Sequence, residues 1–197
     1  EIDPRAYALA EKYWPGPLTI IMKKSDRIPD EVSAGLDTVA IRMPSHECAR
    51  AIISASGLPL AAPSANASGR PSPTTAKHVL DDLDGKIDAV VIDKECAVGV
   101  ESTVISLVGE APRLLRPGAV TAEQLREILP DIVIDSAVLS EIKSGQKVAS
   151  PGMKYKHYAP TTDVYLVEGD SKDFAKFVNG KTNAVAVCFS EEQEDIK

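Results

Sequence analysis

The sequence contains no apolar run that approaches the length of a membrane span, and no segment that resembles a signal peptide. Its three cysteines, Cys48, Cys96 and Cys188, lie far apart and form no C-x-x-C pair. An odd number of isolated cysteines argues against a disulfide framework and favours buried thiols in a reducing compartment. We therefore expect a cytoplasmic protein without a membrane segment.

Basic residues are fewer than acidic ones, because 22 Lys and Arg stand against 29 Asp and Glu for a net charge of −7. The basic residues form no block along the chain. A protein that binds RNA through its backbone usually presents a basic face. Direct nucleic-acid binding by this segment is therefore not expected.

Several catalytic signatures are also missing. The sequence has no G-x-G-x-x-G and no H-E-x-x-H motif, and its three histidines are not spaced as metal ligands. Residues 180–182, Gly-Lys-Thr, resemble the end of a P-loop, but the first glycine of that motif would fall on Ala175. We therefore find no support for a protein-held zinc site, a serine hydrolase or a Rossmann dehydrogenase.

The chain does contain a regular alternation of short apolar runs with amphipathic segments, and its 197 residues suffice to bury a core. Gly109 and Glu110 form a hairpin turn, so we expect a mixed sheet in a layered α/β domain that extends to about residue 134. The predicted strands are residues 18–22, 38–43, 58–62, 89–93, 103–108 and 113–116, and the predicted helix N-caps are Asp3, Ser45, the pair Thr74 and Thr75, and Thr121.

Residues 63–73 form the segment around which the chain is organised. They consist only of Pro, Ser, Ala, Asn, Gly and Arg, so none brings bulk to a core. The hydroxyls of Ser64, Ser68 and Ser72 and the amide of Asn66 suit phosphate or carboxylate oxygens. A plain surface connector has the same composition, and the residues alone leave both interpretations open.

Two polar residues lie at strand ends. Alternation over residues 38–43 places Val39 and Ile41 on one face and Arg42 on the other, where it either binds a ligand or faces solvent on an edge strand. Ser102 lies where a loop enters a strand, which is a common position for a functional hydroxyl and a commoner one for a turn cap.

The carboxyl-terminal third has a different organisation. Apolar periodicity fades over residues 136–146, and residues 150–160 carry two tyrosines and two lysines between prolines. We expect an extended linker whose tyrosines dock onto another surface. Residues 164–167, 172–178 and 184–189 predict a strand, a helix and a strand that begin a second domain.

Six motifs together resemble the YrdC-like family, and more closely its two-domain members, the threonylcarbamoyl-AMP synthases. They are W-P-G-P-L-T, T-V-A-I-R-M-P, P-S-A-N-A-S-G-R-P-S-P-T, E-S-T-V-I-S, L-R-P-G-A-V and S-P-G-M-K-Y-K-H-Y-A-P. The resemblance implies a YrdC-like twisted mixed sheet with helices over residues 1–135, a linker over 136–161 and the start of a small Rossmann-like β-α-β domain over 162–197.

The resemblance also implies an activity. Members of the family are nucleotidyltransferases that condense L-threonine, bicarbonate and ATP, with Mg²⁺, into threonylcarbamoyladenylate and pyrophosphate, and other proteins then transfer the threonylcarbamoyl group to tRNA. Matched motif by motif, the ATP-binding positions are Thr38, Ser64, Asn66, Ser72, Arg116 and Tyr155, and the threonine-binding positions are Arg42, Ala62 and Ser102. No general base is identified.

One departure from the family concerns the K-x-R motif, which precedes W-P-G-P in its members and is not found in this chain. We expect either that this part of the pocket wall lies outside the given sequence or that the segment is inactive alone. Two other functions are open to a YrdC-like chain, namely an RNA-binding or ribosome-associated module without synthesis activity and a carbamoyltransferase that uses a YrdC-like domain to mature hydrogenases. The first predicts a basic face and the second predicts zinc-finger-like cysteine pairs, and the sequence shows neither.

Overall fold

The computed structural model describes residues 2–139 and 162–196, and the chain divides into two compact units, Glu1–Tyr158 and Ala159–Lys197. The linker segment 150–160 with Tyr155 therefore lies outside the described residues. The described helices of the first unit are α1 (Pro4–Tyr13), α2 (Asp30–Ser33), α3 (Glu47–Ser56), α4 (Ala76–Leu83), α5 (Ala122–Arg126) and α6 (Ser136–Leu139).

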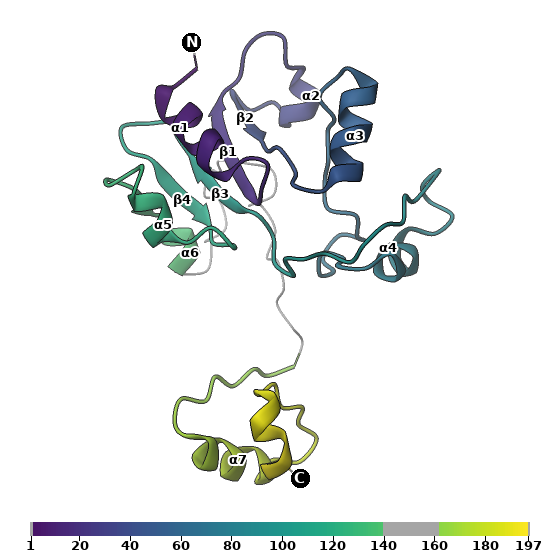
Figure 1. Ribbon diagram of the computed structural model, residues 1–197, viewed down its shortest axis with the longest axis vertical. Coiled ribbons are helices and arrows are strands. Elements are labelled where there is room, and N and C mark those ends of the chain that lie inside the picture. Colours follow the sequence, from purple (N-terminus) through teal and green to yellow (C-terminus); the bar gives the residue numbers. More distant parts are fainter. Residues whose placement is uncertain (1, 140–161, 197) are drawn as a thin grey trace. The chain divides into compact units, whose positions relative to one another are not determined.

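The first unit contains a mixed sheet, as the hairpin predicted (Figure 1). Within the described residues it has five strands in the order β2-β1-β3-β4-β5, namely β1 (Leu18–Lys23), β2 (Thr38–Ile41), β3 (Thr103–Ser106), β4 (Arg113–Arg116) and β5 (Val133–Ile134). The β1–β3 and β4–β5 pairs are parallel, whereas β1–β2 and β3–β4 are antiparallel.

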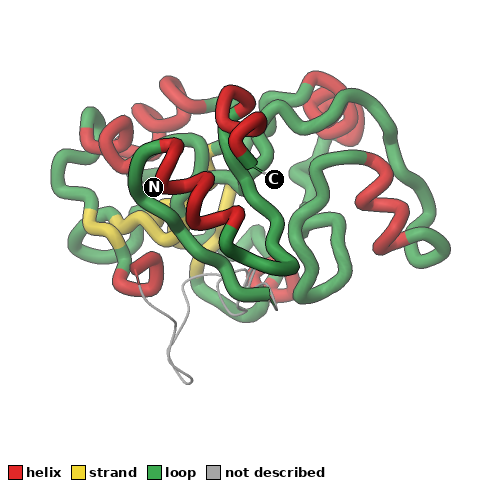
Figure 2. Tube along the Cα trace, turned by 90° about the horizontal axis from the view of Figure 1, so that it is seen from below, coloured by secondary structure: helices red, strands yellow, loops and turns green. Residues whose placement is uncertain are grey.

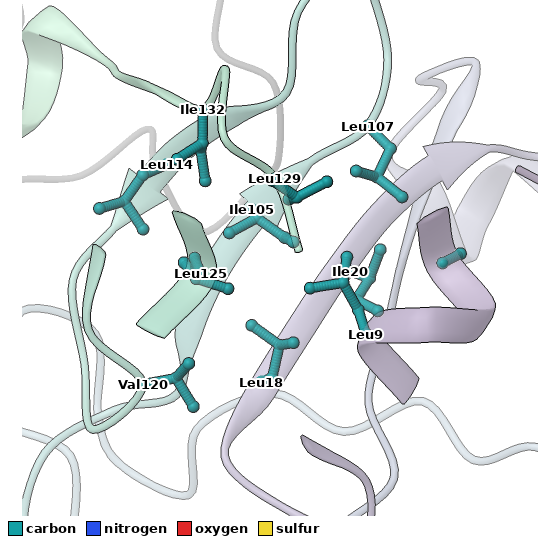
Figure 3. Close-up of a cluster of buried hydrophobic side chains, with 11 residues drawn as sticks. Leu9, Leu18, Ile20, Ile105, Leu107, Leu114, Val120, Leu125, Leu129 and Ile132 are labelled. Carbon is teal, nitrogen blue, oxygen red and sulfur yellow. The ribbon is translucent and has the colours of Figure 1, made fainter. Parts of the chain in front are cut away.

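The main core lies on one face of this sheet, where α1 and α5 cover it. Leu9 of α1 and Leu125 of α5 are fully buried and pack against Leu18, Ile20 and Ile105 of the central strands (Figure 3). Burying a side chain of this size is worth about 1.5–3 kcal/mol. The central strands β1 and β3 are therefore anchored by the main core.

The local signals for helix ends are mostly confirmed. Asp3 caps α1, Thr75 caps α4, and Thr121 forms a capping box with Gln124 at the start of α5. The prediction for α3 was one residue early, since its N-cap is His46 rather than Ser45. Each confirmed cap depends on bonds within one turn of chain, which is why the sequence alone predicts it.

Two segments predicted as strands are not strands. Residues 58–62 and 89–93 are coil, and Leu58, Val91 and Ile92 are 66%, 65% and 65% exposed. A strand needs a hydrogen-bonded neighbour, and within the described residues neither segment belongs to the sheet. An apolar run indicates what a segment would bury, but not whether a neighbouring strand is available to it.

The second unit has helix α7 (Ser171–Asn179), as predicted, and a 3₁₀ helix at Ser190–Asp195. Residues 164–167 and 184–189 are coil instead of the predicted strands. The strands of the described residues, yellow in Figure 2, all belong to the first unit. Tyr165 packs edge-on against Phe177, and the Lys181 ammonium lies 5.0 and 4.7 Å from the two ring centroids. Among the described residues, the helices are all too short or too polar to cross a lipid bilayer.

Candidate functional site

Four strands, β1 to β4, place their termini together at one end of the sheet. Because β2 runs antiparallel to β1, β3 parallel to it and β4 antiparallel to β3, the starts of β1 and β3 meet the ends of β2 and β4 there. Two bonds tie the connecting segments together: Gly16 N–H donates to Met43 O at 2.9 Å, and Thr103 N–H donates to Pro17 O at 2.9 Å.

The sheet face opposite the main core carries the polar residues at this end, and we call it the site face. Leu18 and Ile20 point into the core, so Thr19 and Ile21 point to the site face. Residues paired across strands share a face, which adds Val104 opposite Thr19 and Ala40 opposite Ile21. The same alternation places Thr38 and Arg42 on this side.

A register shift between β3 and β4 decides the direction of Arg116. Ile105 pairs with Leu114, whereas the preceding Val104 pairs with Arg116, so Leu115 is an extra residue in β4. Without the shift Arg116 would pair with Thr103 and share its side of the sheet, the side of the main core. An extra residue of this kind re-aims the side chain that follows it. Arg116 therefore lies on the site face.

Arg116 is bound to Ser102 through two of its nitrogens. Its Nε donates to Ser102 O and its Nη2 donates to Ser102 Oγ, both at 3.0 Å. Ser102 Oγ also lies 2.8 Å from Thr19 Oγ1, and either hydroxyl can be the donor. Ser102 is only 6% exposed, so this network fixes the half-buried guanidinium in one orientation.

The electrostatics of Arg116 reveal a second cation beside it. Burial lowers the pKa of Arg116, and the positive charge of Arg42 lowers it further, whereas Glu101 acts in the opposite direction. Arg42 is exposed and follows β2 by one residue. A half-buried guanidinium that lies near a second positive charge forms a site that an anion stabilises.

The segment after β4 clamps Ser102 in place. A Cβ at Gly118 would lie 2.5 Å from Glu101 O and 2.5 Å from Thr103 N, so only glycine fits this approach. Thr103 Oγ1 donates to Val120 O at 2.7 Å and accepts from Val120 N–H at 3.1 Å. The backbone on both sides of Ser102 is thus fixed by the R-P-G-A-V segment.

The loop of residues 63–73 is folded around one tight turn, residues 67–70. Arg70 N–H donates to Ala67 O at 3.0 Å, and Gly69 has φ +84°, as the third position of a type II turn requires. Asn66 Nδ2 donates to Ala67 O and Arg70 O, both at 3.0 Å. Asp82 of α4 accepts from Ala67 N–H at 3.0 Å and from Arg70 Nη1 at 2.5 Å.

The structure thus brings Arg42, Ser102 and Arg116 together at one end of the site face. Thr38 shares that face but begins β2, so it lies at the other end of this strand. The remaining predicted positions belong to the loop and its approach: Ala62 and Ser64 are exposed, and Asn66 and Ser72 are half-buried.

Two residues of the site were not predicted. The signal for Thr19 was a single hydroxyl within the apolar run of residues 18–22, and Thr19 points away from the main core because its neighbours Leu18 and Ile20 point into it. The signal for Asp82 was a carboxylate between Val79 and Leu83, on the stripe of α4 that was predicted to face inward. Each signal is one residue long and depends on a partner far away in sequence.

Known proteins resemble both parts of the chain. The family model Sua5_yciO_yrdC, described as telomere recombination, matches residues 1–118, and a model described as the C-terminal domain of threonylcarbamoyl-AMP synthase matches residues 120–196. A crystal structure of Pyrococcus abyssi Sua5 complexed with L-threonine has a TM-score of 0.81 and is 46% identical, covering 90% of this chain and 53% of that one.

Curated relatives give the same result. Threonylcarbamoyl-AMP synthase of Pyrococcus abyssi is 49% identical over 169 residues, which cover 86% of this chain and 49% of the relative. The protein of the same name from Bacillus subtilis is 49% identical over 166 residues, which cover 84% of this chain and 47% of the relative. The chain thus spans about half the length of the curated relatives it matches.

Proposed function

Because this chain belongs to the Sua5/YrdC family and its residues 120–196 match the C-terminal domain of threonylcarbamoyl-AMP synthase, we propose that the full-length protein makes threonylcarbamoyladenylate. In this reaction the threonine amine bonds to the carbon of bicarbonate and water leaves. A carbamate oxygen then bonds to the α-phosphorus of ATP and pyrophosphate leaves. The product serves the threonylcarbamoyladenosine modification of tRNA, to which other proteins transfer the group.

The observation that carries this proposal is the pair of guanidinium groups at Arg42 and Arg116. Arg116 stays half-buried although burial and Arg42 both lower its pKa. The substrates of the proposed reaction bring a carboxylate and a triphosphate, and each compensates positive charge. Joining two negatively charged reactants requires positioning and charge neutralisation more than proton transfer.

The residues divide between the two substrates. The guanidinium of Arg42 holds the threonine carboxylate through two parallel hydrogen bonds, a geometry that lysine does not reproduce. Thr19 can donate to Ser102 Oγ, which leaves the proton of Ser102 for threonine, and the backbone at Ala62 completes this side. Arg116, Thr38, Ser64, Asn66 and Ser72 meet the nucleotide, and Tyr155 of the linker joins them.

Mg²⁺ accompanies ATP in this proposal. Within residues 2–139 and 162–196, His, Cys, Asp and Glu do not gather in groups of three or more that suit a metal ion. We therefore expect the ion to be carried by the phosphates and by water, as Mg²⁺ often is. It supplies charge neutralisation of the triphosphate, while the protein residues orient it.

We place the reaction in the cytoplasm. Cys48, Cys96 and Cys188 are all free thiols, which suits a reducing compartment. The net charge of −7 also suits a protein that passes a small adenylate onward rather than binding tRNA itself. Its partners are accordingly ATP, L-threonine, bicarbonate and the downstream threonylcarbamoyl-transfer proteins.

The test uses full-length protein with ATP, Mg²⁺, bicarbonate and L-threonine, and follows pyrophosphate release. We expect release to require threonine and to fall about a hundredfold in Arg116→Ala, because one fixed cation at the reacting phosphates is lost. Arg113→Ala is the matched control, since Arg113 begins the same strand and binds Asp135 at 2.8 Å. ATP turnover that continues unchanged without threonine would overturn the assignment.

A further inference from the structure

We propose that Asp82 is a positioning residue that holds the loop of residues 63–73 in its ligand-binding conformation. The inference rests on the proposed function, since it takes this loop to be the one that meets the nucleotide. Asp82 lies near the end of α4, fifteen residues after Ala67. Neither the motifs nor the predicted site residues include it.

The two carboxylate oxygens of Asp82 bind the two ends of one turn. Oδ2 accepts the backbone N–H of Ala67 at 3.0 Å, and Oδ1 accepts Nη1 of Arg70 at 2.5 Å. Ala67 and Arg70 are also the first and last residues of the turn closed by Arg70 N–H and Ala67 O. One side chain on a helix thus fixes both ends of a loop that has little apolar surface to pack.

The carboxylate is placed for this task and not for stabilising its own helix. The Asp82 side chain is 7% exposed, whereas that of Arg70 is 64% exposed. The Ala67 N–H, first, and the Arg70 guanidinium lower the pKa of Asp82, so the group stays ionised. A negative charge in the last turn of a helix opposes the helix dipole, so α4 itself gains nothing from it.

The turn of residues 67–70 also orients the side chain of Asn66. Its Nδ2 donates to Ala67 O and to Arg70 O, which are carbonyls of the same two residues that Asp82 holds. Asn66 Oδ1 is buried and accepts no hydrogen bond from any described residue. A buried amide oxygen without a donor is costly unless a ligand group supplies one. Asp82, the turn and Asn66 therefore form one connected unit that presents this oxygen.

The experiment compares four variants of the full-length protein, Asp82→Ala, Asp82→Asn, Arg70→Ala and Asp81→Ala. Amide hydrogen exchange is measured on peptides that cover residues 64–72, and the dissociation constant for ATP is measured by calorimetry. Asp81→Ala is the matched control, because Asp81 is the adjacent residue of α4 and pairs only with exposed Lys77 among the bonds described.

We expect Asp82→Ala to speed exchange in the loop and to weaken ATP binding about tenfold, since it removes a hydrogen bond to a charged acceptor. Asp82→Asn retains an oxygen for Ala67 N–H, so it should restore most of both properties. Arg70→Ala should have a small effect because the Arg70 side chain is 64% exposed and its charge is screened by solvent, and Asp81→Ala should match the wild type.

Three results would overturn the proposal. They are loop exchange in Asp82→Ala equal to that of the wild type, an equal effect of Asp81→Ala, and faster loop exchange without loss of ATP affinity. If Asp82→Ala does not fold, loop exchange and ATP affinity are compared between Asp82→Asn and Arg70→Ala, which change different bonds of Asp82. A wild-type protein that does not bind ATP would refute the proposed function instead, and the exchange measurement would still decide whether Asp82 holds the loop.

Discussion

At the scale of single residues, Arg42 and Arg116 are held in different ways. Arg116 has a fixed orientation from Ser102, whereas Arg42 is exposed just beyond the end of β2. An arginine that is held by other protein groups keeps its orientation when no ligand is bound. An exposed arginine loses rotamer freedom only when a ligand binds, so its contribution depends on the geometry of that contact.

Replacing Arg42 by lysine tests its role. The charge stays but the two-pronged geometry is lost, so Arg42→Lys should weaken threonine binding by about 1.5–3 kcal/mol and leave ATP affinity nearly unchanged. Calorimetric titration with each substrate measures both. Arg50→Lys on the exposed side of α3 is the control. Equal losses for the two substrates would place Arg42 at the nucleotide or in a purely structural role.

The types of residue in the site were predictable, but their connections were not. Arg42 and Ser102 could be singled out by their positions at strand ends, and Arg116 by its motif. The contact between Thr19 and Ser102 spans 83 residues, and the one between Asp82 and Ala67 spans 15. Such partners become neighbours only through the pairing of strands or the docking of a loop, which no local pattern encodes.

At the scale of elements, the R-P-G-A-V segment acts as a clamp on the start of β3. Gly118→Ala would force a methyl group to within 2.5 Å of Glu101 O and Thr103 N. Because both atoms belong to the backbone, we expect a loss of about 1–3 kcal/mol in the free energy of unfolding.

Activity should fall with stability in Gly118→Ala, since Ser102 lies between the two displaced residues. Denaturant unfolding and pyrophosphate release measure the two effects. Gly99→Ala serves as the control, because nothing lies within 4 Å of a Cβ at that position. A Gly118→Ala protein as stable and active as Gly99→Ala would show that the clamp does not hold Ser102.

Elements with local causes were predicted best. The capping box of Thr121 and Gln124 and the hairpin at Gly109 each depend on a few neighbouring residues, and both are present. The apolar runs at residues 58–62 and 89–93 were predicted as strands and are coil, because pairing depends on a neighbour that composition does not specify.

At the scale of the whole molecule, several carboxylates titrate below their ordinary range. Hydrogen bonds from Arg5 lower the pKa of Asp3 from its ordinary value of 3.8. The Ala67 N–H lowers the pKa of Asp82 from the same value. A bond from its own backbone N–H lowers the pKa of Glu123 from 4.5. The unfolded chain therefore binds protons at a higher pH than the folded chain does.

Stability should consequently fall on acidification. The contribution of these groups is fully present above their ordinary pKa values and is lost as the pH falls through the lower folded values. Thermal unfolding at pH 7, 5, 4 and 3 should show a falling midpoint below about pH 4. Asp3→Asn keeps a good N-cap but does not titrate, so it should reduce the slope. A midpoint that rises toward pH 3 would contradict this assignment.

Because of the register shift at Leu115, the number of residues between the hairpin and Arg116 decides which face of the sheet carries the guanidinium. Along a strand, odd and even positions face opposite sides, so a single inserted or deleted residue between the hairpin and Arg116 exchanges the two sides. Deletion of Leu115 would turn the guanidinium toward the side of Thr103 and Leu18, where it would be buried away from solvent. The length of this segment is therefore as strict a requirement as the arginine. A homologue with the same residues and one gap would keep the motif while losing the cation from the site.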